Sequence, residues 1–162
     1  MPNAYLITFC CYGKWLPGQP GAVDRKHSLP GSRAMPESHP LERHARSSMP
    51  DQSRKLHAAQ RIAVLDALLG VCMHQGWSRI AVHVRSDHVH VVVNADTKPE
   101  KVMVVFKRYA SRALNRGNSS ETQRRWWARH GSTRYLWTKD EVSAAVRYVV
   151  EGQGEPMAWW AE

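Results

Sequence analysis

Residues 77–94 read WSRIAVHVRSDHVHVVVN, and this stretch decides the fold. Apolar and polar side chains alternate on both sides of Ser86-Asp87, which is typical of two strands, 77–85 and 88–94, joined by a two-residue hairpin turn. Pairing across the turn gives one apolar face made of three pairs: Val84 with Val89, Val82 with Val91, and Ile80 with Val93. We therefore expect this face to lie on a hydrophobic core.

The opposite face of the same hairpin carries nitrogen-rich side chains. Arg85 faces His88 there, and His83 faces His90. Because side chains alternate along a strand, His88 and His90 point to one side while Val89 points into the core. Two such imidazoles can hold one metal ion, and the alternative is a pair of surface or hydrogen-bonded histidines. Histidines left without a ligand on a covered sheet would be costly, which favours the metal site.

A strand and a helix are predicted before the hairpin. Residues 5–11 are β-branched and aromatic, which predicts a strand covered on both faces. Asp51 or Ser53 can cap a helix that runs to Gln75 and ends at Gly76. Its predicted buried stripe consists of Ile62, Leu65, Leu69 and Cys72.

A long loop is expected between this strand and this helix, at about residues 13–52. Six of the nine prolines fall there, among glycines and basic side chains that begin with Lys14. A loop of this length in a small domain is typical of a functional or mobile segment, and its charge would suit a flexible contact with nucleic acid. A plain solvated loop is the alternative.

Three further elements are predicted after the hairpin. A helix runs from Pro99 to about Asn115, and a short strand covers residues 134–137. Thr138 and Glu141 form a capping box that opens a last helix through Glu151, which residues 152–154 terminate. The stripe of the first helix is Val102, Phe106, Ala110 and Ala113, and that of the last is Val142, Ala145, Val146 and Val149. The order β-α-β-β-α-β predicts an α+β fold, a ferredoxin-like antiparallel sheet with helices on one face plus the C-terminal helix.

Composition bounds the size and the partners of the protein. A chain of 162 residues with 43% hydrophobic residues suits a single globular domain over residues 1–162. Lys and Arg number 23 against 14 Asp and Glu, and the net charge of +9 indicates a polyanionic partner, nucleic acid rather than membrane. No apolar stretch near the start is long enough to span a bilayer, so we expect a cytoplasmic protein. Cys10, Cys11 and Cys72 are expected to be reduced, buried thiols.

Several motifs together resemble a known family. His88-Val89-His90 matches the HUH motif of single-tyrosine transposases, in which a hydrophobic residue separates two histidines. Three segments resemble the REP-associated tyrosine transposases of that family: AYLITF at 4–9, YGKWLPG at 12–18 and RYVVEGQG at 147–154. The resemblance covers most of the chain except residues 25–50.

The resemblance implies a metal-dependent nuclease and strand transferase that acts on single-stranded DNA, often next to a hairpin. A divalent ion held by His88 and His90 would polarise the scissile phosphate, and a tyrosine on the last helix would attack it to form a 5′-phosphotyrosine link. A nearby cation suits this chemistry, because a phenol with a pKa of ~10 is a poor nucleophile at neutral pH. Covalent capture also conserves the energy of the phosphodiester for rejoining.

The resemblance also implies a third metal ligand, an amide or carboxylate four residues after the tyrosine, where this chain has Gly152. Gln153 is the ligand we expect, because at the end of the helix it could swing into the same place. Glu151 and His83 remain alternatives. Imidazole and oxygen ligands suit Mg²⁺ or Mn²⁺, whereas a third imidazole would favour zinc.

Two tyrosines on predicted helices are candidates for the nucleophile. Tyr109 lies near the flank of its helix's apolar stripe and should be partly committed to the core. Tyr148 lies outside the centre of its stripe, between Ala145 and Gly152, where small neighbours leave room for a phosphate. The family's nucleophile lies on a late helix, so the resemblance also favours Tyr148.

Basic and aromatic residues supply the candidates for DNA contact. Stacking of a base on an indole needs no sequence code, so we expect one of two adjacent tryptophans to hold an unpaired nucleotide and the other to be core. The candidates are Arg85, Lys107, Arg108, Arg124, Arg125, Trp126, Trp127, Arg134 and Arg147. Solvated arginines without a DNA role are the alternative.

Other classes of function remain open at this level. A protein of the same fold could bind DNA or RNA without cutting it, and Gly152 at the usual ligand position favours that interpretation. A metal-binding structural protein is a weaker third possibility, because the charge of +9 argues against it. The chain could act as a monomer or as a homodimer that exchanges its last helix.

Overall fold

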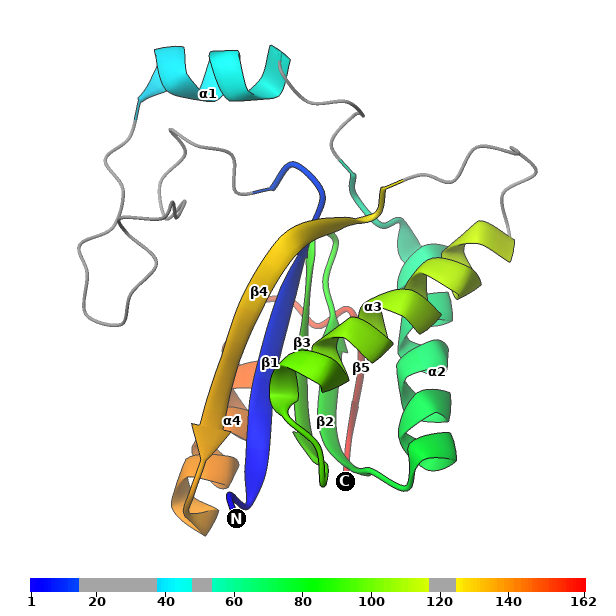
Figure 1. Ribbon diagram of the computed structural model, residues 1–162, viewed down its shortest axis with the longest axis vertical. Coiled ribbons are helices and arrows are strands. Elements are labelled where there is room, and N and C mark those ends of the chain that lie inside the picture. The colour runs from blue at the N-terminus through cyan, green and yellow to red at the C-terminus, as the bar shows by residue number, and fades with distance from the viewer. Residues whose placement is uncertain (15–37, 48–53, 117–124) are drawn as a thin grey trace.

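The computed structural model describes residues 1–14, 38–47, 54–116 and 125–162, and its centre is an antiparallel sheet (Figure 1). The sheet has five strands in the order β4-β1-β3-β2-β5, and each neighbouring pair is antiparallel. The strands are β1 (Ala4–Cys11), β2 (Ser78–Val84), β3 (His88–Asn94), β4 (Trp127–Leu136) and β5 (Ala158–Ala161). Strands β1 to β4 with the helices between them confirm the predicted ferredoxin-like fold, and β5 adds an edge strand that was not predicted.

Helices cover both faces of the sheet (Figure 1). On one face, α2 (Ala58–Gln75) and α3 (Pro99–Arg116) build the larger core with side chains such as Phe9, Leu68 and Phe106. On the other face, α4 (Lys139–Val150) packs Ala145 and Val149 on a smaller cluster from four strands. The C-terminal helix therefore covers the face that carries the histidines.

The hairpin has the predicted register near its turn and a different one further away. Val84 pairs with Val89, and His83 pairs with His90, as expected. The predicted pairing of Ile80 with Val93 is wrong, because a bulge between Arg79 and Ala81 shifts the register. The extra residue turns Ile80 to the α4 side, where it packs against the smaller cluster.

One row of paired residues crosses the whole sheet on the α4 face. From edge to edge it contains Trp159 of β5, His83 of β2, His90 of β3, Thr8 of β1 and Ser132 of β4. Paired residues point to the same side of an antiparallel sheet. The fold thereby brings side chains from distant parts of the sequence next to His90.

Helix α2 begins later and faces the core differently than predicted. His57 is its cap and forms a capping box with Gln60, whereas Asp51 and Ser53 lie outside the described residues. Of the predicted stripe, Ile62 is exposed, Leu65 and Leu69 are partly buried against the larger core, and Cys72 is buried. The buried side chains are Val64, Leu68, Val71 and Cys72. Because α2 is apolar on several sides, its sequence does not single out one buried face. The helix ends as predicted, at Gly76 in the left-handed conformation.

The predicted loop at 13–52 contains a short helix, α1 (His39–Ser47). Its side chains are not buried, and an i,i+4 ion pair joins Arg46 to Glu42 at 2.9 Å. The prediction of a continuous loop was therefore wrong over these residues. Residues 15–37 and 48–53 lie outside the described part of the chain.

The remaining elements agree with the predictions in place and differ in length. Helix α3 buries Leu114 where Ala113 was expected, and β4 starts at Trp127 instead of Arg134. β4 lies at an edge of the sheet, and its early part carries basic and polar side chains, as is typical of edge strands. Its sequence therefore lacks the alternation of apolar and polar residues that predicts a strand. The capping box of Thr138 and Glu141 is confirmed, and α4 ends at Val150.

The three cysteines are thiols and not disulfides, and the described helices do not include one long and apolar enough to cross a membrane. Cys11 and Cys72 are buried, while Cys10 is only partly buried. Burial raises the pKa of the Cys11 thiol to about 12 and that of the Cys72 thiol to about 11. Both thiols therefore stay protonated and unreactive at neutral pH.

Candidate active site

The site is built on the first residues of β3, directly after the hairpin turn. His88 and His90 project from the same face, with ring centroids 4.7 Å apart and ring planes at 77°. Thr8 of β1 lies 2.7 Å from His90 through Oγ1 and Nδ1, and Asp87 lies 2.7 Å from His88 through Oδ1 and Nδ1. The Nδ1 atom of each ring is thus held by a neighbour, which leaves both Nε2 atoms facing a common point.

Gln153 occupies that common point. Its Oε1 lies 3.0 Å from His90 Nε2 and 3.3 Å from His88 Nε2. Its own Nε2 donates to the Tyr148 carbonyl at 3.1 Å, which fixes the orientation of the amide. Two imidazoles and one amide oxygen therefore converge from β3 and from the turn that follows α4.

The backbone after α4 explains why Gln153 reaches this point. A side chain at Gly152 would meet the Tyr148 carbonyl oxygen at 2.8 Å from its Cβ, so the tight turn favours glycine there. Gly154 has a φ of 78°, a left-handed conformation that glycine adopts without strain. Glu151 is exposed, and Gln153 is the residue of this turn that meets the histidines.

Both ring nitrogens of His83 contact the backbone. The Met157 N–H donates to its Nε2 at 3.0 Å, and its Nδ1 lies 2.7 Å from the Val149 carbonyl oxygen. Burial lowers its pKa, in keeping with a neutral ring that uses one nitrogen as donor and the other as acceptor. In this structure Gln153, and not His83, meets the Nε2 atoms of His88 and His90.

The donor set fits a divalent ion with oxygen and nitrogen ligands. In the part of the chain that the structure describes, no three His, Cys, Asp or Glu side chains gather as a metal cluster, because the third donor here is an amide. Burial and the neighbouring His88 lower the pKa of His90 to about 4, so its ring is neutral at pH 7. Neutral imidazole is the form that ligates a metal.

Tyr148 lies beside this donor set on the flank of α4. Its side chain is 49% exposed, and its ring meets the His90 ring edge to face with centroids 5.3 Å apart. Tyr109 packs partly against the larger core on the opposite face of the sheet. The structure therefore brings Tyr148, and not Tyr109, to the histidines.

Charged side chains at the hairpin tip complete the site. Lys14 Nζ lies 2.9 Å from Asp87 Oδ1 and 2.8 Å from His88 Nδ1. Burial alone would raise the pKa of Asp87, but the neighbouring His88 and Lys14 outweigh this effect and lower the pKa below its ordinary value. Asp87 is thus an ionised carboxylate at neutral pH.

The two tryptophans do not offer a stacking surface, which corrects the expectation that one of them is exposed. Trp126 is 4% exposed and Trp127 is 7% exposed. Trp127 Nε1 donates to Ser111 Oγ at 3.0 Å and its ring packs edge to face on Phe9, while Trp126 Nε1 donates to Asn115 Oδ1 at 2.8 Å. Both indoles are buried because β4 extends further towards them than the sequence pattern indicated.

The basic candidates divide by their place in the fold. Lys107 donates to the carbonyls of Ala128 and His130, and these two hydrogen bonds join α3 to β4. Burial lowers the pKa of Lys107. Arg108 is exposed on α3, which covers the face away from the histidines. Arg125 stacks over the Tyr12 ring at 5.2 Å, and Arg124 lies outside the described residues.

Three arginines lie on the side of the histidines. Arg134 is exposed and pairs with Leu6, which faces α4. Arg147 is exposed on α4 next to Tyr148. Arg85 donates to the Glu155 carbonyl in the turn that carries Gln153. These residues form a basic surface on the same side of the sheet as the site.

Thr8, Asp87 and Lys14 belong to the site but were not predicted as parts of it. Thr8 has no local signal, because only the pairing of β1 with β3 brings it to His90. Asp87 was expected as a turn residue, and Lys14 as the first basic residue of the loop. Proximity to the HUH triplet was the available signal for Asp87.

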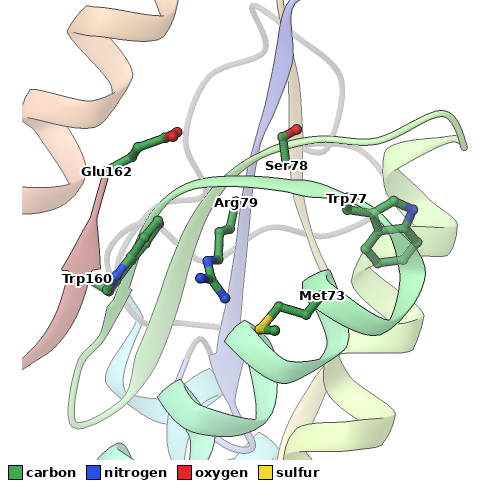
Figure 2. A pocket seen from close by; sticks show the side chains of 6 residues that line it. All are labelled: Met73, Trp77, Ser78, Arg79, Trp160 and Glu162. Atoms are coloured by element: carbon green, nitrogen blue, oxygen red, sulfur yellow. The ribbon is translucent and has the colours of Figure 1, made fainter.

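A pocket of about 320 Å³ lies on the other side of the sheet and is separate from this site (Figure 2). It is lined by Met73, Trp77, Ser78, Arg79, Trp160 and Glu162. Figure 2 shows Arg79 and Trp160 side by side, with the guanidinium carbon 4.9 Å from the ring centroid. Trp160 pairs with Val82, which faces the larger core, so the pocket does not open toward the histidines.

Known proteins define the class to which this fold and site belong. The sequence matches the family model described as "Transposase IS200 like" over residues 50–150 of its 162. The chain therefore belongs to the IS200-like transposase family, which confirms the family predicted from the HUH motif. A transposase of this family acts on DNA.

Two solved structures are similar to the chain. The structure described as a REP-associated tyrosine transposase bound to a REP hairpin is 11% identical, with a TM-score of 0.52, and the match covers 94% of this chain and 67% of that one. This match agrees with the fold. A Deinococcus radiodurans protein, described provisionally as a transposase, is 12% identical with a TM-score of 0.47, covering 94% of this chain and 92% of that one. No curated protein matches the chain.

Proposed function

We propose that the protein is a metal-dependent single-stranded DNA endonuclease and strand transferase of the REP-associated type, which forms a 5′-phosphotyrosine intermediate at hairpin-associated sites. The observation that carries this proposal is the meeting of Gln153 Oε1 with both histidine Nε2 atoms beside Tyr148. The family supplies the DNA context, and the basic residues around the site supply a surface for phosphates.

His88, His90 and Gln153 would hold a divalent ion, Mg²⁺ or Mn²⁺. Such an ion, when bound, polarises the scissile phosphate and stabilises charge on the oxygens that react. The amide oxygen of Gln153 and the two imidazoles would supply the protein donors to such an ion.

Tyr148 is the proposed nucleophile. Its phenolic oxygen would attack the phosphorus in line with the bond to the departing 3′-oxygen, so that one P–O bond forms as the other breaks. The phenol proton would pass to solvent, because the side chain is about half exposed, and the departing 3′-oxygen would take a proton from water to leave a 3′-hydroxyl. DNA rejoining would reverse the step with a 3′-hydroxyl as the attacking group.

Arg134, Arg147 and Arg85 are the proposed contacts to the DNA backbone, because they lie on the side of the histidines. The single strand is the proposed substrate and an adjacent hairpin the proposed recognition element. The 11% identical structure is described as bound to a REP hairpin, which suggests this class of DNA.

The test is a covalent adduct. Hairpin-containing single strands are incubated with the protein and Mn²⁺, and a denaturant-resistant protein–DNA adduct is expected. His88→Ala and His90→Ala should each abolish it with the fold retained, because both side chains leave the packed face of β3. Hairpin binding without an adduct in any divalent ion would instead support the alternative, a binding protein of the same fold that has lost its chemistry.

A further inference from the structure

The Nδ1 atom of His88 has two neighbours of opposite hydrogen-bonding character. Asp87 Oδ1, at 2.7 Å, is a carboxylate oxygen that only accepts. Lys14 Nζ, at 2.8 Å, is an ammonium group that only donates. A ring nitrogen cannot donate and accept at once, so each neighbour selects a different tautomer of His88.

The other ring nitrogen shows which tautomer this structure holds. Gln153 Oε1 faces the Nε2 atoms of both histidines, because the amide nitrogen of Gln153 donates to Tyr148. An amide oxygen only accepts, so a hydrogen bond to it requires a proton on Nε2. With its proton on Nε2, His88 presents Nδ1 as an acceptor, which suits Lys14 and not Asp87.

A metal ion reverses this preference. A metal binds imidazole through an unprotonated nitrogen, and the proton then resides on the other nitrogen. For His88 this is Nδ1, where Asp87 can accept the proton and Lys14 finds no acceptor. We propose that Asp87 and Lys14 are opposed positioning residues: Asp87 stabilises the His88 tautomer that binds a divalent ion, and Lys14 stabilises the tautomer that excludes it.

This selection concerns His88 and not His90. The partner of His90 Nδ1 is the Thr8 hydroxyl, at 2.7 Å, and a hydroxyl can donate or accept. Thr8 therefore serves either tautomer. The inference rests on the metal site proposed above and adds the residues that decide when His88 is ready to bind.

The backbone keeps both selecting residues in place. The Cys11 N–H donates to the Asp87 carbonyl at 2.8 Å, and the Lys14 N–H donates to the Cys11 carbonyl at 3.2 Å. The end of β1 thus joins Lys14 to the hairpin tip. Lys14 can leave His88 Nδ1 and keep its ion pair with Asp87, whose Oδ1 lies 2.9 Å from Nζ.

The first test measures the tautomer of His88 by ¹⁵N nuclear magnetic resonance in the metal-free protein at pH 8, where an ordinary imidazole is neutral. The wild-type ring should carry its proton on Nε2, and Lys14→Met should move it toward Nδ1. Lys101→Met, which removes an exposed lysine on α3, is the control and should change nothing. A wild-type proton on Nδ1, or an unchanged tautomer in Lys14→Met, would overturn the inference.

The second test measures Mn²⁺ affinity by calorimetry without DNA. Lys14→Met should bind about 3- to 10-fold more tightly, because the competent tautomer is more populated. Asp87→Asn should bind about 10- to 100-fold more weakly. Asp66→Asn, at an exposed site on α2, is its control and should bind as the wild type does. Equal affinities in all these variants would contradict the proposal.

The two measurements distinguish tautomer selection from a purely electrostatic effect of Lys14 and Asp87 on the ion. An electrostatic effect would change the affinities with the same signs but leave the metal-free tautomer unaltered, which would overturn the inference. Wild-type protein that binds no Mn²⁺ would contradict the metal site, while the tautomer measurement would still decide the roles of Lys14 and Asp87. If Lys14→Met does not fold, Lys14→Gln removes the obligate donor and keeps a polar side chain.

Discussion

Tyr148 and Tyr109 lie on opposite sides of the sheet, and only Tyr148 contacts the histidine pair. We predict that Tyr148→Phe eliminates the covalent DNA adduct and retains hairpin binding, because it removes one oxygen from a half-exposed ring. Tyr109→Phe is the matched control and should form the adduct at close to the wild-type rate. Mass spectrometry of the linked peptide measures the outcome, and a peptide containing Tyr109 would reverse the assignment.

His83 joins the two ends of the turn that carries Gln153, since it contacts the Val149 carbonyl and the Met157 N–H. Its pKa is lowered by burial, so the folded protein keeps the ring neutral while the unfolded chain takes up a proton near pH 6.5. Its contribution to stability is therefore complete above about pH 6.5 and declines as the pH falls through the folded-state pKa, by at most about 1.4 kcal/mol per pH unit.

This contribution can be isolated by substitution. We predict that His83→Gln, which can still donate and accept but does not titrate, makes the free energy of unfolding less dependent on pH between about 8 and 5.5. Urea denaturation at several pH values measures this dependence. His74→Gln, at an exposed position on α2, is the control and should follow the wild-type profile. An unchanged slope in His83→Gln would show that the ring does not cause the acid sensitivity.

At the scale of elements, a capping box stabilises the start of α4, the helix that carries Tyr148. Thr138 Oγ1 accepts from the Glu141 N–H at 3.1 Å, and Glu141 Oε2 accepts from the Thr138 N–H at 3.0 Å. We predict that Thr138→Ala lowers the free energy of unfolding by about 1 kcal/mol. For a domain of this size the melting temperature should fall by about 2–4 °C.

Thr138→Ser keeps the hydroxyl and is the control for this prediction. Scanning calorimetry should find its melting temperature close to that of the wild type. At temperatures well below melting, Thr138→Ala should form the DNA adduct normally, because the folded helix still presents Tyr148. A melting temperature of Thr138→Ala equal to that of the wild type would contradict the role of the cap.

The elements that could be predicted from the sequence are those with a strong local signal. The period of two placed His83 opposite His90, and the S/T-x-x-E pattern located the start of α4. The bulge at Arg79 has no such signal, so the position of Ile80 was wrong. Strand β5 is four residues long, too short for a period to appear.

The site itself was predictable in part. The HUH resemblance indicated His88, His90 and Tyr148, and the position of Gln153 after Gly152 suggested an amide ligand. Thr8 could not be found, because its place beside His90 depends on the pairing of β1 with β3. The burial of Trp126 and Trp127 depends in the same way on the length of β4.

At the scale of the whole molecule, the charge of +9 predicts a salt-sensitive partnership with DNA. Binding to single strands should weaken with salt, with a slope of log K against log salt of about −0.7 for each phosphate that is neutralised. We predict that Arg134→Gln and Arg147→Gln each reduce the steepness of this slope by about 0.7. Fluorescence anisotropy across salt concentrations measures it.

Arg112→Gln is the control for the salt dependence. Arg112 is exposed on α3, on the face of the sheet away from the histidines, and its guanidinium lies over the Tyr109 ring. This variant should keep the wild-type slope. If Arg112→Gln lowers the slope as much as Arg134→Gln does, the DNA path does not follow the α4 face.

The double anchorage of His83 limits which changes in chain length the protein can accept. One end of the turn is fixed at Val149 and the other at Met157, so the span between them is set by a single buried ring. Replacing an exposed side chain within this span leaves the span intact. Inserting or deleting one residue there would move Gln153 away from the histidines or pull an anchor from His83, so this turn should tolerate substitution far better than any change in its length.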